Sequence, residues 1–140
     1  MYICTINTML VTVDTSVIIA IIFNEPHKDE LIGLTRGKEL IAPESLMSEM
    51  GNALSAMLRR DRISLDDALG AFAVFQQIPV RTIPIDMKSV LTVVSEHRIY
   101  AYDAYMIWCA IQTGSALVSL DEQMIRIARK KNIDILEVTT

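Results

Sequence analysis

Residues 10–23 read LVTVDTSVIIAIIF, and a change of pattern inside this stretch decides the fold. Its first part, residues 10–13, is a short apolar run with β-branched side chains, which favours a strand. Polar residues 14–16 follow, and then a second apolar stretch, residues 17–23, which favours a helix that ends near Asn24-Glu25-Pro26. The segment therefore predicts a strand, a turn and a helix.

The rest of the chain continues this alternation. Apolar runs predict further strands at residues 39–42, 80–85, 116–120 and 133–138. Helical spacing predicts helices at residues 28–35, about 44–60, 87–97, 103–112 and 122–130, with another after Ser64. Strands separated by helices imply a largely parallel sheet that is covered on both faces. We therefore expect an α/β protein, a three-layer α/β/α sandwich with a mostly parallel central sheet.

Local signals predict where several helices begin and end. Pro43 suits the first turn of the helix that follows it, where a missing N–H leaves no bond unmade. Ser64 and Asp67 have the spacing of a capping box at the start of an amphipathic helix. Gly114 stands where the preceding helix needs a C-terminal cap.

The composition fits one globular domain over residues 1–140. Hydrophobic residues make up 51% and charged residues 21% of the 140 residues, so a core is available. Residues 1–8 precede a second methionine, Met9, and either form an N-terminal extension or belong to the domain. The net charge of −4 means that bulk charge does not attract nucleic acid, so a polyanion would need a basic patch or bound cations.

The cysteines and the N-terminal segment favour a location in the cytoplasm. Cys4 and Cys109 have no C-x-x-C spacing and no cluster with histidine, which argues against a disulfide framework and against a zinc site. No Lys or Arg precedes Lys28, so the charged start of a signal peptide is missing. The apolar run at residues 17–23 is far shorter than the ~20 residues that span a bilayer. We expect a cytoplasmic protein that does not enter a membrane.

Four acidic residues stand where an open parallel sheet places its ligands. Such sites lie beyond the carboxyl ends of strands, and Asp14 and Asp121 each directly follow an apolar strand. Asp103 is in the first turn of its helix, where the helix dipole favours a carboxylate. Glu49 lies one position off the apolar stripe of its helix, and Asn52 shares its face. All four acids can therefore converge at one edge of the sheet.

Each acid alone has an ordinary structural explanation. Asp14 and Asp103 suit helix caps, and Asp121 suits the start of a turn. Glu49 alone suits a solvent-facing helix charge. Taken jointly, like charges at one edge would repel and raise some of their pKa values unless a cation sat among them. A divalent metal resolves this conflict.

The segments around these acids also occur in a recognisable order. They are VTVDTSVIIA around Asp14, SEMGNAL around Glu49, YDAYMIWCA around Asp103 and LVSLDEQM around Asp121. The ordered set resembles the PIN-domain nucleases, and among them the VapC-type toxins of toxin–antitoxin pairs. The resemblance covers nearly the whole chain from Met9 onward. It implies that these four acids are the catalytic and metal-binding residues of a metal-dependent endoribonuclease.

Supporting roles fall on three polar residues: Ser16, Ser119 and Asn52. Ser16 resembles the family's D-x-S/N element, although it also suits a helix cap. Ser119 stands where the family often has threonine, a change that keeps the hydroxyl. Glu122 offers a second acid next to Asp121, although Asp121 is the one that aligns with the motif.

Oxygen ligands without Cys or His suit hard cations, here Mg²⁺ with Mn²⁺ as the alternative. Outside the four acids, the chain carries thirteen acidic and thirteen basic residues, so the remainder is balanced. The resemblance further implies an RNA substrate, a homodimer and a VapB-like antitoxin. Apolar residues in excess on two consecutive helices, among them Met47 and Leu69, also favour a partner, although core packing explains them as well.

Other interpretations stay open beside the nuclease. A PIN-like protein-binding module without significant nuclease activity is one. A receiver domain is disfavoured, because it needs paired acids after the first strand and a lysine that ends a late strand. Here Asp14 stands alone, and neither residues 116–121 nor residues 133–138 contain a lysine. His27 and His97 have no catalytic partner at a recognisable spacing, which disfavours a histidine ribonuclease. Two basic clusters, one at residues 59–62 and the other at residues 126–131, are more simply solvated helix ends.

Overall fold

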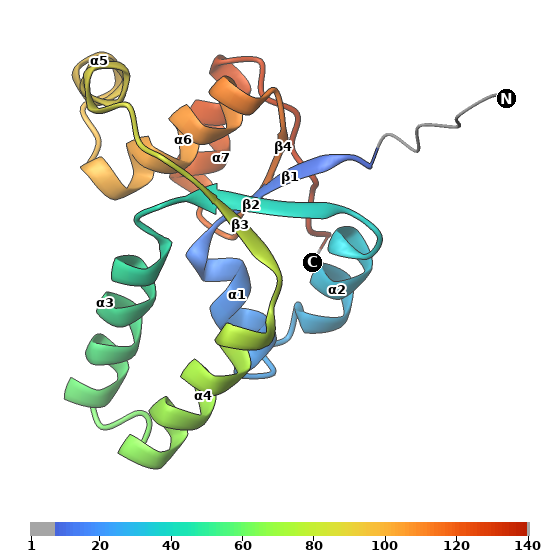
Figure 1. Cartoon of the computed structure of the whole chain (residues 1–140), viewed down its shortest axis with the longest axis vertical. Coiled ribbons are helices and arrows are strands. Elements are labelled where there is room, and N and C mark those ends of the chain that lie inside the picture. Colours follow the sequence, from blue (N-terminus) through green and yellow to red (C-terminus); the bar gives the residue numbers. More distant parts are fainter. Residues whose placement is uncertain (1–7, 140) are drawn as a thin grey trace, which may run out of the picture.

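The computed structural model describes residues 8–139, and its centre is a four-stranded sheet (Figure 1). The strands are β1 (Leu10–Val13), β2 (Glu39–Pro43), β3 (Val80–Ile83) and β4 (Ala116–Val118). They lie in the order β3-β2-β1-β4, and every neighbouring pair is parallel. The predicted parallel sheet is confirmed, and β1 lies inside it between β2 and β4.

Helices cover both faces of the sheet (Figure 1). One layer contains α1 (Thr15–Ile22), α2 (Lys28–Thr35), α3 (Leu46–Arg59) and α4 (Leu65–Gln77). The other contains α5 (Met87–His97), α6 (Ala101–Thr113) and α7 (Glu122–Lys130). Within these layers α1 contacts α2, α3 and α4, whereas α6 contacts α5, α7 and strands β1 and β2. The predicted three-layer α/β/α arrangement is therefore confirmed.

The burial of β1 explains its apolar sequence. Val11 and Val13 are fully buried, as expected for a strand that has helices on both faces. Thr12 between them is also buried, and its hydroxyl shares a 2.7 Å hydrogen bond with the hydroxyl of Ser115. A buried polar group with a partner of this kind avoids the free-energy penalty of an unmade hydrogen bond.

Two predicted helix boundaries are confirmed by their geometry. Ser64 Oγ accepts a hydrogen bond from the backbone N–H of Asp67, and the Asp67 carboxylate accepts one from the N–H of Ser64. This reciprocal pair is the predicted capping box at the start of α4. Gly114 ends α6 in the left-handed conformation, at φ 63°, which glycine adopts without steric penalty.

The predicted place of Pro43 in the first turn of a helix is wrong. Pro43 is the last residue of β2 and aligns with Ile83 of β3, and α3 begins only at Leu46. Pairing of β2 with β1 runs to Ile41, so the missing N–H of Pro43 removes no bond from that ladder.

The predicted strand at residues 133–138 is also wrong. Only one bridge is present there, between Leu117 and Ile135. The partner strand β4 ends at Val118 rather than at the predicted residue 120 because the chain turns away at Ser119. Before the bridge, the N–H of Ile133 bonds to the carbonyl of Ala128 in α7, so the segment pairs with β4 at Leu117 alone.

Residues 1–7, which include Cys4 and all but the last residue of the expected extension, lie outside the described part of the chain. Cys109 is buried and free. Within residues 8–139, no helix combines the length and the apolar character needed to cross a membrane.

Candidate functional site

Asp14 is the residue at which β1 passes into α1, and it is almost completely buried, with 6% of its surface exposed. Its Oδ2 atom accepts two hydrogen bonds. Ser16 Oγ donates one at 2.7 Å, and Ser119 Oγ donates the other at 2.8 Å. Because Ser119 follows β4, these bonds join the carboxyl ends of two neighbouring strands.

Each of the two serine hydroxyls is held in turn by a backbone amide. The N–H of Leu120 donates to Ser16 Oγ at 3.2 Å, and the N–H of Asp121 donates to Ser119 Oγ at 3.0 Å. A hydroxyl that accepts from a backbone amide has its own proton free to donate, so both protons point toward Asp14. This arrangement, which we call the serine clamp, fixes the orientation of the Asp14 carboxylate.

Asp121 lies just beyond the clamp, at the start of α7. Its Oδ1 accepts a hydrogen bond from the N–H of Met124 at 3.1 Å, so the side chain caps this helix. Asp121 therefore has the ordinary structural role of a helix cap. This cap uses one of its two carboxylate oxygens.

Glu49 enters the site from the first turn of α3, and only 8% of its surface is exposed. The alternative of a solvent-facing charge is wrong. Burial raises the pKa of Glu49 to about 7, and the negative charges of Asp14 and Asp103 add to the rise. A hydrogen bond of 2.7 Å from Ser45 Oγ to Glu49 Oε2 opposes it.

The four carboxylates act on one another electrostatically. Burial raises the pKa of Asp14, and the charge of Asp121 raises it further, although both serine hydrogen bonds lower it. The pKa of Asp103, in the first turn of α6, is also raised, by burial and then by the charges of Asp121 and Asp14. The structure thus brings side chains from four separate parts of the chain into one acidic region.

Basic side chains pair with other carboxylates and not with the four acids of this region. The ion pairs formed by Lys and Arg within residues 8–139 involve three other acids: Glu39, Glu96 and Glu137. Carboxylates that remain close together without a cation destabilise a fold through mutual repulsion.

The donor set of this region fits a hard divalent cation, since every candidate ligand is an oxygen. A buried hydroxyl adds to this set. Thr15 Oγ1 has no hydrogen-bond partner among the described residues, and it lies close enough to Glu49 to lower the pKa of that carboxyl. Within residues 8–139, however, no three acidic, histidine or cysteine side chains are already gathered in a geometry that could hold an ion.

Asn52 lies one turn of α3 beyond Glu49 and is exposed. It borders an open hollow of about 480 Å³, together with Tyr100, Ala101, Tyr102 and Asp103. The shared face predicted for Glu49 and Asn52 therefore leads from the buried acids outward to this hollow.

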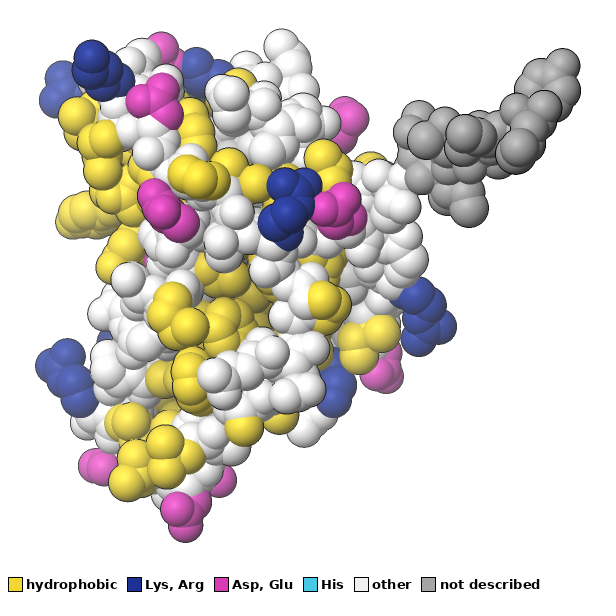
Figure 2. Space-filling model, in the orientation of Figure 1, with side chains coloured by type: hydrophobic (Ala, Val, Ile, Leu, Met, Phe, Trp, Pro, Cys, Tyr) yellow, Lys and Arg dark blue, Asp and Glu magenta, His cyan; other side chains and the backbone are white. Residues whose placement is uncertain are grey.

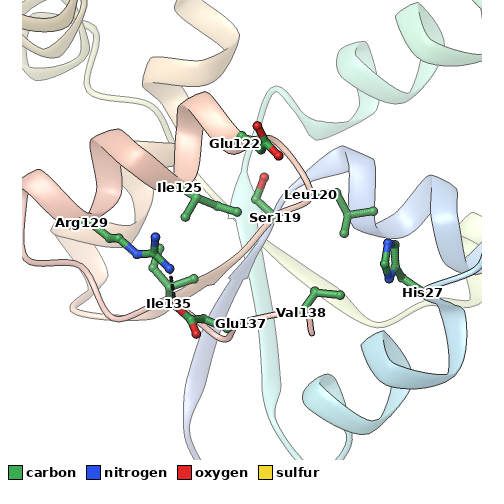
Figure 3. A pocket seen from close by; sticks show the side chains of 9 residues that line it. All are labelled: His27, Ser119, Leu120, Glu122, Ile125, Arg129, Ile135, Glu137 and Val138. Atoms are coloured by element: carbon green, nitrogen blue, oxygen red, sulfur yellow. Dashed lines mark hydrogen bonds and ion pairs between the residues drawn. The ribbon is translucent and has the colours of Figure 1, made fainter. Parts of the chain in front are cut away.

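Glu122 borders a different pocket, of about 350 Å³, which Ser119 and Leu120 of the connection between β4 and α7 also line (Figure 3). His27 and Arg129 also line this pocket, and Arg129 is paired with Glu137. Glu122 is exposed and does not appear among the charges that shift the pKa values of Asp14, Glu49 and Asp103. Asp121, whose charge does raise two of those pKa values, is thus the acid of this corner that takes part in the cluster.

The basic clusters are placed differently from the acids. The residue 59–62 cluster starts at the end of α3 opposite to Glu49, about 15 Å away along the helix axis. In the other cluster, Arg129 and Lys131 form ion pairs with glutamates. Basic side chains on the face seen in Figure 2 are scattered, which agrees with solvated helix ends.

Two residues of this region escaped the sequence analysis: Ser45 and Thr15. Ser45 had a signal, because a hydroxyl four residues before Glu49 shares its helix face. Thr15 had none, since its burial depends on packing between α1 and α3.

A family model for the PIN domain matches residues 11–130. The chain belongs to the PIN domain family. PIN domains are generally nucleases and typically use divalent metal ions. Comparison with curated protein sequences gives no match.

Solved structures of other proteins share the fold of this PIN domain. PAE2754 from Pyrobaculum aerophilum has 25% identity and a TM-score of 0.70, with 91% of this chain and 84% of that chain covered. VapBC2 from Rickettsia felis, bound to a DNA fragment from its promoter, has 14% identity and a TM-score of 0.63, covering 91% and 97%. The PilT N-terminus domain protein SSO1118 from Sulfolobus solfataricus P2 has 12% identity and a TM-score of 0.51, covering 93% and 87%.

Proposed function

We propose that this PIN domain is a Mg²⁺- or Mn²⁺-dependent endoribonuclease that hydrolyses RNA phosphodiesters, and that it is the cytoplasmic toxin of a toxin–antitoxin pair. The observation that carries the proposal is the acidic region. Burial raises the pKa values of Asp14, Glu49 and Asp103, neighbouring carboxylates of the region add to each rise, and no basic side chain pairs with the four acids in the described structure. Such a group is stabilised when it binds a cation.

The residues that would hold the cation are Asp14, Glu49, Asp103 and Asp121. When bound, a divalent ion lowers the pKa of water and stabilises the charge that develops on a phosphodiester. Both serine hydrogen bonds go to Oδ2 of Asp14, and no side chain within residues 8–139 donates to Oδ1, so this oxygen has room for a further ligand. Asp121 is held in place by its cap to Met124.

The proposed nucleophile is water, because within residues 8–139 no histidine is paired with these acids to activate a 2′-hydroxyl. Hydrolysis by water should leave 5′-phosphate and 3′-hydroxyl ends. A 2′-hydroxyl mechanism would instead leave 2′,3′-cyclic phosphates.

Cleavage of single-stranded RNA by the purified protein tests this proposal. Chelation should abolish cleavage, and Mg²⁺ or Mn²⁺ should restore it and raise the melting temperature, since the unfolded chain has no assembled site. Asp103→Asn should lower the rate about a thousandfold. Asp86→Asn is the matched control because Asp86 is an exposed aspartate before a helix, and it should cleave normally.

Cyclic phosphate ends, or an unchanged rate in Asp103→Asn, would contradict the mechanism. If the native protein cuts no RNA but binds a partner protein, and Asp103→Asn binds it equally well, the binding-module interpretation replaces the enzyme.

A VapB-like antitoxin and a second copy of the chain are the proposed protein partners. Hydrophobic side chains remain exposed on α3 and α4, including Met47 and Leu69, and Figure 2 shows such side chains over α4. Coexpression with a small reading frame immediately upstream should give a stable complex, and light scattering should give a dimer mass. A charged Leu69→Lys variant should weaken the complex, and unchanged assembly would exclude this surface.

A further inference from the structure

Tyr100 borders the hollow beside Asp103 and is unusually exposed for a large aromatic residue. It has 86% of its surface accessible, more than any other exposed large hydrophobic side chain of the described residues. An aromatic ring held in water gains free energy when a flat apolar partner covers it.

The backbone beneath this ring is held firmly. Ile99, the residue before it, is buried in the core. The carbonyl of Tyr100 accepts a 3.1 Å hydrogen bond from the N–H of Ala104, at the start of α6. A tyrosine has few rotatable bonds, so a ring on fixed backbone loses little entropy when it binds.

The other walls of the hollow offer polar recognition without a positive charge. Asn52 presents an amide, which both donates and accepts hydrogen bonds. Tyr102 lies between Tyr100 and Asp103 in sequence and makes an edge contact with Tyr105, with ring centres 6.0 Å apart. A ligand here needs a flat face and hydrogen-bonding edges, and Asp103 disfavours an anionic group in the hollow unless a cation is present.

We infer that Tyr100 is a stacking platform for one unpaired base of single-stranded RNA, and that Asn52 contacts the edge of that base. The inference rests on the proposed ribonuclease function and adds a substrate-positioning residue to it. A nucleobase has the required flat face and polar edge, and a phosphodiester at the acids would bring its own bases to the adjoining hollow. Bases of single strands are free to stack on aromatic side chains, whereas bases inside a duplex are not.

The test measures binding of a short single-stranded RNA and of copies that each lack one base. Fluorescence anisotropy is measured in Ca²⁺, a hard cation with looser geometry than Mg²⁺, and a gel verifies that the RNA stays intact. Removing the base that stacks should weaken binding to the native protein about tenfold. Tyr100→Ala should show the same loss with intact RNA and no further loss with the abasic copy.

Two further variants separate stacking from an effect on folding. Tyr100→Trp keeps an aromatic face and should restore both the affinity and its dependence on the base. Ile111→Ala removes an exposed apolar side chain from the opposite end of the same helix and should bind like the native protein. In Mg²⁺, Tyr100→Ala should raise KM about tenfold with little change in kcat.

Equal binding of intact and all abasic RNAs by the native protein, including absence of binding, would overturn the inference. Independent losses from Tyr100→Ala and base removal would do so as well, and so would a change of oligomeric mass in Tyr100→Ala, because the ring would then contact a second copy. Base-dependent binding without any cleavage would instead refute the ribonuclease and leave the stacking site standing.

Discussion

The corner between β1 and α1 and the corner between β4 and α7 each place an aspartate directly before the helix. Asp14 and Asp121 both precede a helix, but only Asp121 caps its helix with its side chain. The Asp14 carboxylate receives serine hydroxyls instead, one of them from the other corner. A local motif thus explains Asp121, whereas the position of Asp14 depends on one local contact, with Ser16, and on one contact with a distant part of the chain, with Ser119.

The largest expected effect is on cleavage by asparagine variants at these two corners. In Asp14→Asn, the serine clamp binds the amide oxygen and leaves the NH₂ group where a cation needs an acceptor. We expect a loss of about a thousandfold in kcat. The loss of kcat in Asp121→Asn should be smaller by a factor of about ten or more. This amide is more exposed and can turn its oxygen toward the cation, and asparagine also caps helices. Equal losses, measured with the same labelled RNA, would remove the distinction between the corners.

The pH dependence of stability tests the buried side of the site. Folding raises the pKa of Glu49 to about 7, so between its unfolded value and about 7 the folded state retains a proton that the unfolded state releases. In chelator, the stability that this retained proton gives the folded state is fully present below the unfolded pKa. It is lost as the pH rises through 7. The expected decrease in the free energy of unfolding is roughly 3 kcal/mol.

Glu49→Gln should flatten this dependence in urea denaturation measured across that pH range. Glu122→Gln, an exposed control, should leave it unchanged. A native profile whose stability rises with pH would contradict the sign of the shift.

The smallest expected effect is on the free energy of unfolding of variants at the two corners, measured in chelator at neutral pH. Asp121→Ala removes a helix cap and should lower the free energy of unfolding by about 1 kcal/mol. Asp14→Asn removes a buried charge from among like charges and should leave stability unchanged or raise it. Thermal melts can rank the two variants, and a reversed order would mean that Asp14 is chiefly structural.

Much of the fold follows from local sequence. The alternation of strands and helices, the capping box at Ser64 and the glycine end of α6 each depend on a few neighbouring residues, and each was predicted. The errors lie where a distant partner decides. Pro43 remains in a strand because β3 pairs with it, and residues 133–138 lack a strand because they meet β4 only at Leu117.

The candidate site divides in the same way. The positions of Asp14, Asp103 and Asp121 were visible as carboxylates at strand ends and in a first helical turn. The burial of Glu49 was not, because one position off an apolar stripe is near the boundary between core and solvent. The coupling among the acids depends on distances between elements, which no local pattern contains.

The serine clamp also has a consequence for the order of folding. Ser119 and Asp14 are separated by 105 positions, so the bond between them closes a loop that includes most of the chain. Contacts of such separation form slowly because they must overcome a large loss of chain entropy first. During synthesis, Asp14 emerges more than a hundred residues before its partner. The acidic corner therefore acquires its geometry only when the chain is nearly complete, and a ribosome-bound fragment that ends before β4 lacks it altogether.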